Sequence, residues 1–204
     1  MLINNAMQAT IEYVCSDATL RHKLFQIDYL ASTSGELVIT LLYHKSLEDE
    51  WVEQANCLLC AMQHLGKINI IGRAKKQKVV VGNDYVTETL RINEQSYSFK
   101  QIENSFTQPN ASININMIEW VISNINKPNT DLLELYCGAG NFTIPLSRCF
   151  RQVLATEISK TSVKAAQDNI TQNEIENLVI ARLSSEEFVQ AYTKVRAFNR
   201  LANI

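Results

Sequence analysis

The stretch DLLELYCGAGNF, residues 131–142, joins a short apolar run to a loop that carries two glycines. The run 132–136 predicts a strand, because it is short, largely apolar and bounded by turn residues. Gly138 and Gly140 predict a tight turn, since a backbone without Cβ lets a ligand approach closely. A helix beginning at Asn141 would leave backbone N–H groups of the turn free to face a polar ligand. The stretch therefore predicts a cofactor-binding loop.

Strand and helix patterns alternate on the C-terminal side of this loop. QVLATEI (152–158) and NLVIARL (177–183) have the composition of strands, and helical patterns cover residues 160–170 and begin again at Ser185. Such alternation is typical of βαβ units with a parallel sheet. A polar connector, NSFTQPN (104–110), precedes this region. We therefore predict an α/β domain over residues 101–204.

The first hundred residues predict a separate domain of mixed α and β structure. LFQIDYLA (24–31) and LVITLLYH (37–44) are rich in β-branched and aromatic residues and flank a turn at Gly35, which predicts a hairpin. Apolar residues then recur with helical spacing between Leu47 and Leu65, and short strand patterns follow. We predict an α+β domain over residues 1–100.

Composition bounds the class of protein. The chain has 204 residues, of which 46% are hydrophobic and 20% charged, and a formal net charge of −2. These values are ordinary for a globular protein, and no apolar run approaches the ~20 residues that span a bilayer. Five cysteines without short, regular spacings predict reduced thiols and a cytoplasmic location.

A second motif supports a nucleotide-like ligand. The strand that follows the loop ends in Glu157, about twenty residues onward, where a carboxylate can accept both hydroxyls of a ribose. The loop is not G-x-G-x-x-G, which weakens a dinucleotide interpretation. Glu134 followed by CGAG is instead similar to the first motif of S-adenosylmethionine-dependent methyltransferases. A purely structural glycine turn is the alternative.

Longer stretches resemble one family, the tRNA (uracil-5-)-methyltransferases, which make 5-methyluridine in the T loop of tRNA. The resemblance rests on ENSFTQPN (103–110), LLELYCGAGNF (132–142) and VLATEISKTSVKAAQDNI (153–170), and LRHKLFQIDYL (20–30) with LLYHK (41–45) agrees. It implies a front RNA-recognition domain, followed by the first half of a Rossmann-like methyltransferase domain. The implied cofactor is S-adenosylmethionine and the implied partner is the T-arm of tRNA.

The resemblance also implies roles for individual residues. Gln108, Tyr136, Asn141 and Glu157 would hold the methyl donor, with Tyr136 as a shelf beside its adenosine part and Gly138 and Gly140 shaping the turn.

In the front domain, the resemblance implies that Phe25 and His44 contact bases of the T loop. GRAKKQK (72–78) predicts a basic cluster that could bind phosphates, with Arg73, Lys75 and Lys76 as its assigned residues. The other basic residues of this cluster are Lys78 in the same stretch and Arg21, Lys23 and Lys45. The alternatives are a core aromatic for Phe25, a surface histidine for His44 and a solvated charged face for the cluster.

The family's catalytic groups are absent from this chain. In the family, a cysteine in a segment like Ser-Cys-Asn-Pro adds to C6 of the base, a carboxylate later removes the C5 proton, and an aspartate precedes two prolines. All three lie beyond the point that corresponds to Ile204. None of the five cysteines has that context, and none of the three prolines precedes another. We therefore predict no catalytic residue here, and Cys137 is interpreted as a bystander thiol.

The same resemblance predicts an incomplete enzyme. We expect an internal fragment or a truncated gene product that starts inside a helix and is inactive alone. Its parallel sheet would have three strands, with the strand before Tyr136 unpaired on one side. An exposed apolar edge favours association, so weak donor binding and self-association are expected.

The sequence also allows a possible metal site, a possible adenine contact and two alternative functions. Cys57, Cys60 and His64 share a helical stripe, but a zinc site needs about four ligands, so no metal site is predicted and buried cysteines are preferred. Ser184 or Ser185 could lie near an adenine, although helix capping is the commoner role. A non-catalytic RNA-binding module and a methyltransferase for small molecules are the two alternative functions.

Overall fold

The structure is a computed structural model that describes residues 2–127 and 130–195. The chain divides into two compact units, Met1–Thr87 and Glu88–Ile204. This division falls at the start of a β-hairpin whose second strand ends at Ile102, whereas the sequence places the boundary after residue 100. The domain assignment 1–100 and 101–204 therefore stays a prediction.

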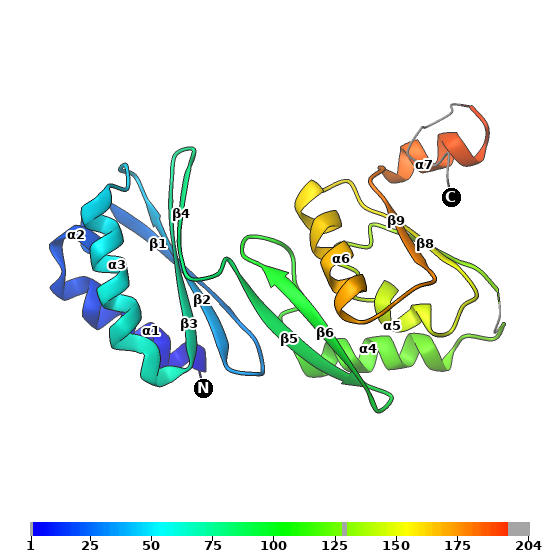
Figure 1. Cartoon of the computed structure of the whole chain (residues 1–204), viewed down its shortest axis with the longest axis horizontal. Coiled ribbons are helices and arrows are strands. Elements are labelled where there is room, and N and C mark those ends of the chain that lie inside the picture. The colour runs from blue at the N-terminus through cyan, green and yellow to red at the C-terminus, as the bar shows by residue number, and fades with distance from the viewer. Residues whose placement is uncertain (1, 128–129, 196–204) are drawn as a thin grey trace. The chain divides into compact units, whose positions relative to one another are not determined.

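The first unit is a four-stranded sheet with helices on one face. The sheet has the order β1-β2-β3-β4, in which β2 and β3 are parallel and the two outer pairs are antiparallel. Figure 1 shows α1 and α3 on the same side of this sheet. The elements are α1 (Leu2–Ser16), α2 (Ala18–Arg21), β1 (Leu24–Ala31), β2 (Glu36–Tyr43), α3 (Asp49–Met62), the 3-10 helix η1 (Gln63–Leu65), β3 (Lys67–Ala74) and β4 (Gln77–Val81).

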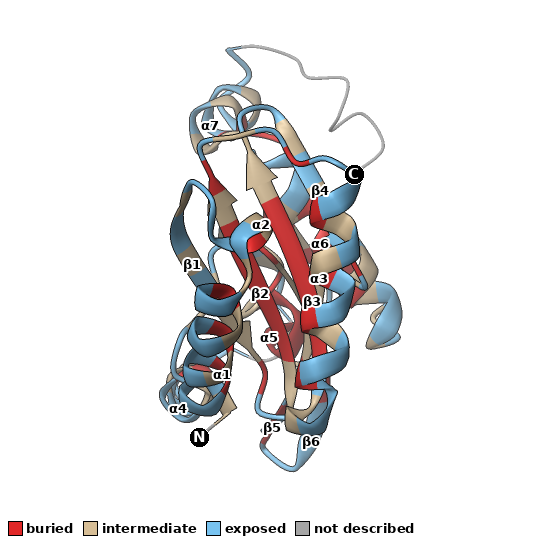
Figure 2. Ribbon diagram, turned by 90° about the vertical axis from the view of Figure 1, so that its left-hand side faces the viewer, coloured by how far each residue is buried: buried red, intermediate tan, exposed pale blue. Residues whose placement is uncertain are grey.

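The core of this unit forms where the central strands meet α3. Figure 2 shows buried residues along β2 and β3. Gly72 on β3 lies against α3 so closely that a Cβ would approach the Trp51 ring to 2.6 Å. The hairpin predicted around Gly35 and the helix predicted after Ser46 are both confirmed. Close packing of an amphipathic helix on a sheet thus accounts for the helical spacing of apolar residues in this segment.

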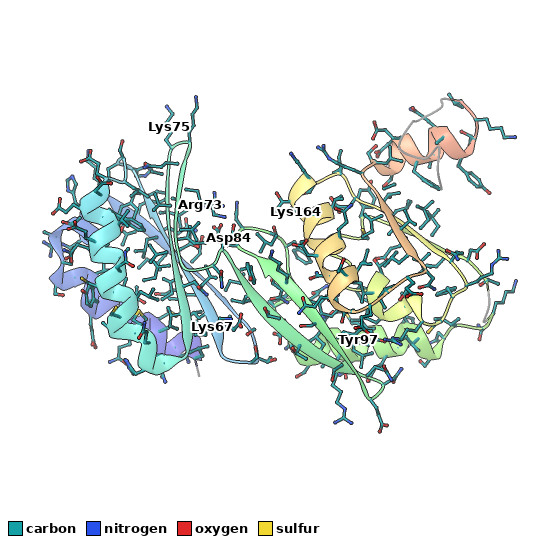
Figure 3. The ribbon with its side chains drawn as sticks, viewed as in Figure 1. Lys67, Arg73, Lys75, Asp84, Tyr97 and Lys164 are labelled. Atoms are coloured by element: carbon teal, nitrogen blue, oxygen red, sulfur yellow. The ribbon has the colours of Figure 1, made fainter. Side chains whose placement is uncertain are left out.

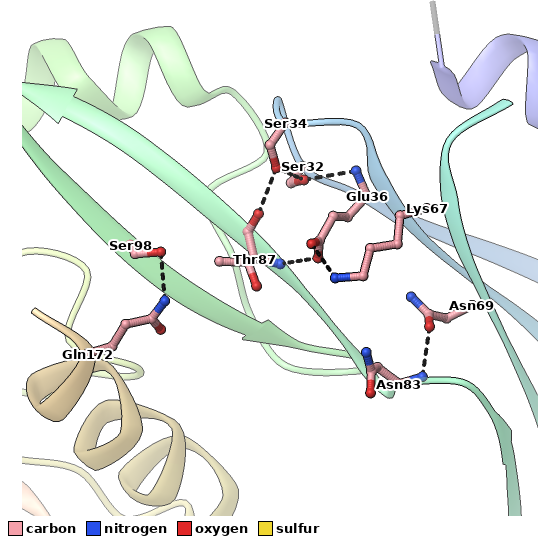
Figure 4. Close-up of polar contacts among 9 residues, drawn as sticks. All are labelled: Ser32, Ser34, Glu36, Lys67, Asn69, Asn83, Thr87, Ser98 and Gln172. Carbon is pink, nitrogen blue, oxygen red and sulfur yellow. Dashed lines mark hydrogen bonds and ion pairs between the residues drawn. The ribbon is translucent and has the colours of Figure 1, made fainter.

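A polar network fastens the turn between β1 and β2 to the end of this unit (Figure 4). The Glu36 carboxylate accepts from Lys67 Nζ at 2.7 Å and from the Thr87 N–H at 2.8 Å. Although burial opposes the change, these contacts lower the pKa of Glu36. Beyond β4, the Asn69 side chain accepts from the Asn83 N–H at 2.7 Å. The Glu36 carboxylate is therefore paired, whereas Nδ2 of Asn69 is buried without a hydrogen-bond partner among the described residues.

The second unit contains a parallel sheet with alternating helices. Its sheet has the order β7-β8-β9, and the β5–β6 hairpin forms a separate pair. This arrangement confirms the predicted α/β class with βαβ units. The elements are β5 (Tyr85–Ile92), β6 (Gln95–Ile102), α4 (Ala111–Ser123), β7 (Leu132–Leu135), α5 (Thr143–Ser147), β8 (Val153–Thr156), α6 (Lys160–Gln172), β9 (Leu178–Ala181) and α7 (Ser185–Tyr192).

Strand β7 is an edge strand within the described residues, because it pairs only with β8 there. Its residues Leu133 and Leu135 are 45% and 37% exposed, respectively. Leucine side chains of a parallel strand are normally covered on both faces. The unpaired edge expected from the sequence is therefore present.

Among the described residues, no helix has both the length and the apolar character of a membrane span.

Candidate functional site

The loop after β7 follows an unusual backbone path. Tyr136, Gly138 and Gly140 have φ angles of 59°, 58° and 85°, so three of five successive residues are left-handed. At Gly140, a Cβ would also lie 3.1 Å from the Ile144 side chain of α5. At Gly138 there is open space, so glycine is favoured there by its backbone angle alone. Tyr136 adopts the same conformation at a cost of about 1–2 kcal/mol, as a residue with a Cβ.

The N–H groups of this loop are paired within the protein. The Cys137 N–H donates to the Thr156 carbonyl at 3.0 Å, and the Gly140 N–H donates to the Cys137 carbonyl at 2.9 Å. The Gly138 N–H donates to Glu157 Oε2 at 3.1 Å. The expectation that loop N–H groups are free for a ligand is therefore wrong for these three residues. The loop instead offers a ligand its shape and the side chains around it.

A cavity of about 400 Å³ opens beside the loop, at the carboxyl ends of β7 and β8. This is the end at which open α/β sheets bind ligands. The structure brings together five of the six residues that the sequence assigns to the donor, whereas Gly140 lies outside the lining and shapes the turn. Those five are Gln108, Tyr136, Gly138, Asn141 and Glu157.

Glu157 links the loop to the cavity. Its Oε1 accepts from the Ser159 N–H at 2.7 Å, while Oε2 holds the Gly138 N–H. A carboxylate has about four lone-pair sites, so acceptor capacity remains for a ligand hydroxyl. Glu157 thus has the position and chemistry expected of a ribose acceptor, and it also fastens the loop.

Asn141 is held by a partner that sequence reasoning missed. Its side-chain amide exchanges two hydrogen bonds of 2.8 Å with Asn114 of α4. Asn114 is buried and lies one turn before the buried Ile118. A polar residue on the apolar face of a predicted helix was the available signal. The reciprocal amide pair fixes the orientation of Asn141 at the cavity wall.

Glu134 brings an under-coordinated carboxyl group to the cavity. It lines the cavity, and its Oε2 is buried without a hydrogen-bond partner among the described residues. Burial raises the pKa of the Glu134 carboxyl above its ordinary value. A buried, unpaired carboxyl oxygen suits a cationic group of a ligand.

Cys137 is unsuited to nucleophilic attack. The residue is buried, and burial raises the pKa of its thiol to about 12, with further contributions from the Glu134 and Glu157 carboxylates. Because the thiolate is the reactive form, a thiol with this pKa is inert at neutral pH. This property supports the interpretation of Cys137 as a bystander.

A second cavity, of about 650 Å³, lies in the first unit. The residues Phe25, His44, Arg73 and Lys75 line it. The Phe25 and His44 rings are stacked, with centroids 4.0 Å apart and planes inclined by 13°. Since Phe25 is 51% exposed, the alternative of a core aromatic is wrong. The structure thus assembles an aromatic and basic pocket from segments distant in sequence.

The basic groups around this pocket differ in their surroundings. Figure 3 shows Lys75 at the tip of the β3–β4 hairpin, with Arg73 further along the same hairpin. Lys76 is exposed in the same turn, at a φ of 61°, and is not part of the pocket lining. Lys45, which the sequence adds to the basic cluster, lines the pocket and donates to the Thr19 carbonyl at 2.6 Å.

The structure also tests the interpretations of the α3 cysteines and of the serine before α7. Cys57 and Cys60 are exposed on α3, so the interpretation of both as buried core cysteines is wrong. Among the described residues, no group of three or more His, Cys, Asp or Glu side chains is arranged to hold a metal ion. Ser184 caps α7 in a reciprocal capping box with Glu187, which confirms the capping role.

Comparison with known proteins gives consistent results. The family model described as tRNA (Uracil-5-)-methyltransferase matches residues 1–204. The tRNA/tmRNA (uracil-C(5))-methyltransferase of Pseudoalteromonas atlantica is 57% identical over 204 residues, which are 100% of this chain and 56% of that protein. The Actinobacillus pleuropneumoniae protein of the same name is 52% identical, over 100% of this chain and 55% of its own length. The chain therefore spans just over half the length of these relatives.

A solved structure shares the fold. The tRNA (uracil-54, C5)-methyltransferase of Pyrococcus abyssi, crystallised in complex with S-adenosyl-L-homocysteine, superposes with a TM-score of 0.61 at 15% identity. The superposition covers 85% of this chain and 45% of that protein. At this identity the likeness concerns the fold alone, and it confirms the predicted α/β fold class.

The left-handed conformation of Tyr136 predicts that one substitution will raise stability and lower ligand affinity. The substitution Tyr136→Asn is expected to raise the free energy of unfolding by about 1 kcal/mol, because Asn tolerates this backbone conformation. The ring is 65% exposed, so little packing is lost. The same substitution should weaken binding of an adenosine ligand about fivefold through loss of the aromatic face. Urea denaturation and calorimetric titration measure the two effects.

The control is Glu174→Asn, at an exposed residue with a φ of 55° outside the cavity. It should give the same gain in stability with unchanged ligand affinity. Equal ligand affinity in both variants would contradict the role of the Tyr136 ring.

Proposed function

Because the chain belongs to the tRNA (uracil-5-)-methyltransferase family, we propose that it binds the methyl donor and the RNA substrate of that reaction. The reaction is the transfer of a methyl group from S-adenosylmethionine to C5 of the T-loop uridine of tRNA. The observation that carries this proposal is the cavity at the carboxyl ends of β7 and β8, lined by five residues of the family motifs. When bound, the donor supplies a methyl group activated on a positively charged sulfur.

The described residues fit this donor chemically. Glu157 suits the ribose hydroxyls, and Tyr136 offers an exposed aromatic face beside the loop. The unpaired Oε2 of Glu134 suits the positive charge of the donor, either on its ammonium or on its sulfonium. The adenine, the ribose and one positive charge of the donor are thus each proposed to have a complementary group in this cavity.

The first unit is proposed to receive the T-arm. The stacked Phe25 and His44 rings present an aromatic platform of the kind on which unpaired bases stack. Arg73 and Lys75 line the same pocket, and cationic side chains there suit the phosphates of the RNA backbone. Lys76 would add a phosphate contact from the turn. On this proposal residues 1–100 are the RNA-binding domain, residues 101–204 are the first half of the methyltransferase domain, and the location is the cytoplasm.

The chain by itself is proposed to lack the covalent step. Cys137 is the one thiol among the residues that line the donor cavity, and its pKa of about 12 keeps it protonated. A base must be attacked at C6 before its C5 carbon can accept a methyl group. A non-catalytic RNA-binding module is the second candidate, favoured by the fact that the aromatic pocket is built within the first unit alone.

The raised pKa of Glu134 predicts how donor binding depends on pH. A cationic ligand favours the ionised form of Glu134. Below the raised pKa, Glu134 must therefore release its proton when the ligand binds. Affinity for S-adenosylmethionine, which we expect to be weaker than micromolar, should therefore rise with pH and level off once Glu134 is ionised. Glu134→Gln should abolish this rise and weaken binding about tenfold on the plateau. Calorimetric titration across the pH range measures both.

The control is Glu157→Gln, which should weaken binding at every pH while the pH dependence is retained. A pH-independent affinity in the unsubstituted chain, or micromolar binding by a clean monomer, would contradict this account.

RNA binding is tested by filter binding with a T-arm oligonucleotide over a range of salt concentrations. Phe25→Ala should weaken binding about tenfold, since stacking of one base on an aromatic ring contributes ~1–3 kcal/mol. Lys75→Ala should reduce the salt dependence by about one phosphate contact. Lys164→Ala, at an exposed lysine of α6 (Figure 3), is the charge-matched control and should change neither. Salt-independent binding would favour a small-molecule methyltransferase.

The exposed edge of β7 is proposed to cause self-association. Sedimentation velocity should show concentration-dependent oligomers, because an unpaired strand edge with exposed leucines is a template for pairing. Leu133→Lys should return the chain to a monomer. Ile113→Lys on α4, at a residue that is 52% exposed and lies on no strand edge, is the matched control and should leave the oligomers intact. A monomer at all concentrations would contradict this proposal.

A further inference from the structure

We propose that Asn169 of α6 is a positioning residue for the donor loop, which it holds against strand β6. The inference rests on the proposed function, since it assigns a role in the same donor site. It starts from the position of the Asn169 side chain, which is fully buried with 0% exposure. A buried amide must find partners for both its donor and its acceptor. The identity of those partners carries the inference.

Asn169 bridges two parts of the cavity wall. Its Oδ1 accepts from the Lys100 N–H of β6 at 2.7 Å, and its Nδ2 donates to the Ala139 carbonyl at 3.0 Å. Ala139 lies between the two glycines of the loop, and both Lys100 and Ala139 line the cavity. One side chain therefore connects the loop to the strand that faces it across the site.

The loop is consequently held from two directions. Glu157 accepts from the Gly138 N–H at 3.1 Å, and Asn169 donates to the carbonyl of the next residue. These two bonds fix the 137–138 and 139–140 peptide groups, one on each side of the peptide that joins Gly138 to Ala139, in a segment where glycines allow many conformations. A loop fixed before the ligand arrives loses less conformational entropy on binding. The bond from Asn169 therefore favours donor binding without a contact to the donor.

A neighbouring residue shows how this differs from ordinary packing. Asn173, one helical turn later, accepts from the Ser98 N–H at 2.8 Å and donates to the Ser98 carbonyl at 2.7 Å. Gln172 adds a bond of 2.9 Å to the Ser98 hydroxyl, which Figure 4 shows. Asn173 thus binds β6 by the same chemistry as Asn169 but has no contact with the loop. The chain provides its own matched control.

The test compares Asn169→Asp with Asn173→Asp by hydrogen exchange of the loop amides and by calorimetry with S-adenosylmethionine. Aspartate retains the acceptor for β6 and loses the donor, which places a carboxylate oxygen against the Ala139 carbonyl in the first variant. We expect Asn169→Asp to lower protection of the Gly138 and Gly140 amides at least tenfold and to weaken donor binding about tenfold. Asn173→Asp should leave loop protection and donor affinity unchanged.

Equal loss of loop protection in both variants, in parallel with global stability, would overturn the proposal, because Asn169 would then act only in packing. Unchanged protection in Asn169→Asp would overturn it equally. If the aspartate variant does not fold, Asn169→Ser removes both bonds without adding charge and has the same expected outcome. A selective loss of protection in a chain that binds no donor would uphold the positioning role and count against the proposed function instead.

Discussion

The geometry of the second unit depends on the bond between the Gly138 N–H and the Glu157 carboxylate. The chain reverses after β7 through left-handed residues, which an isolated peptide would not hold in one arrangement. A carboxylate at the end of the neighbouring parallel strand stabilises this reversal and is brought to the cavity by it. The residue suited to the ribose and the residue that maintains the loop are thus the same. This coupling explains why glycines and an acid twenty residues apart act as one motif.

Each unit contains its own cavity, and the two cavities differ in chemistry. The first unit presents stacked rings and cationic side chains, and the second presents carboxyl groups and an aromatic face around a cavity. Cationic groups suit an anionic polymer, whereas carboxylates suit a cationic small molecule. The chain spans just over half the length of its relatives, and its parallel sheet has an uncovered edge at β7 among the described residues. On the proposed function, binding of the two ligands is therefore separable from the chemistry between them.

Much of this arrangement is readable from the sequence because its signals are local. The strand before Tyr136, the turn at the two glycines and the helix spacing after Ser46 follow from composition and periodicity, and the structure confirms them. The family resemblance predicted the donor-binding residues, five of which line one cavity. The stacking of Phe25 on His44 could not be derived from spacing alone, since it depends on how β1 pairs with β2.

Other features were missed because they depend on tertiary contacts. The pairing of Asn141 with Asn114 and the bridging by Asn169 both join segments about thirty residues apart. The loop N–H groups were expected to be free, but those of Cys137, Gly138 and Gly140 are paired within the protein. Cys57 and Cys60 were expected to be buried, but both are exposed on α3. The asparagine contacts and the loop N–H groups thus depend on partners from other elements, whereas the predicted burial of the two cysteines was wrong.

The most direct measurement of the central claim is an NMR titration of the chain with S-adenosylmethionine, followed through the backbone amide resonances. We predict that the resonances of Gly138, Gly140 and Glu157 shift together with saturable dependence on ligand concentration, while those of β1–β4 do not move. Shifts confined to the first unit, or none in the loop at millimolar ligand, would contradict the claim that the bend after β7 seats the donor.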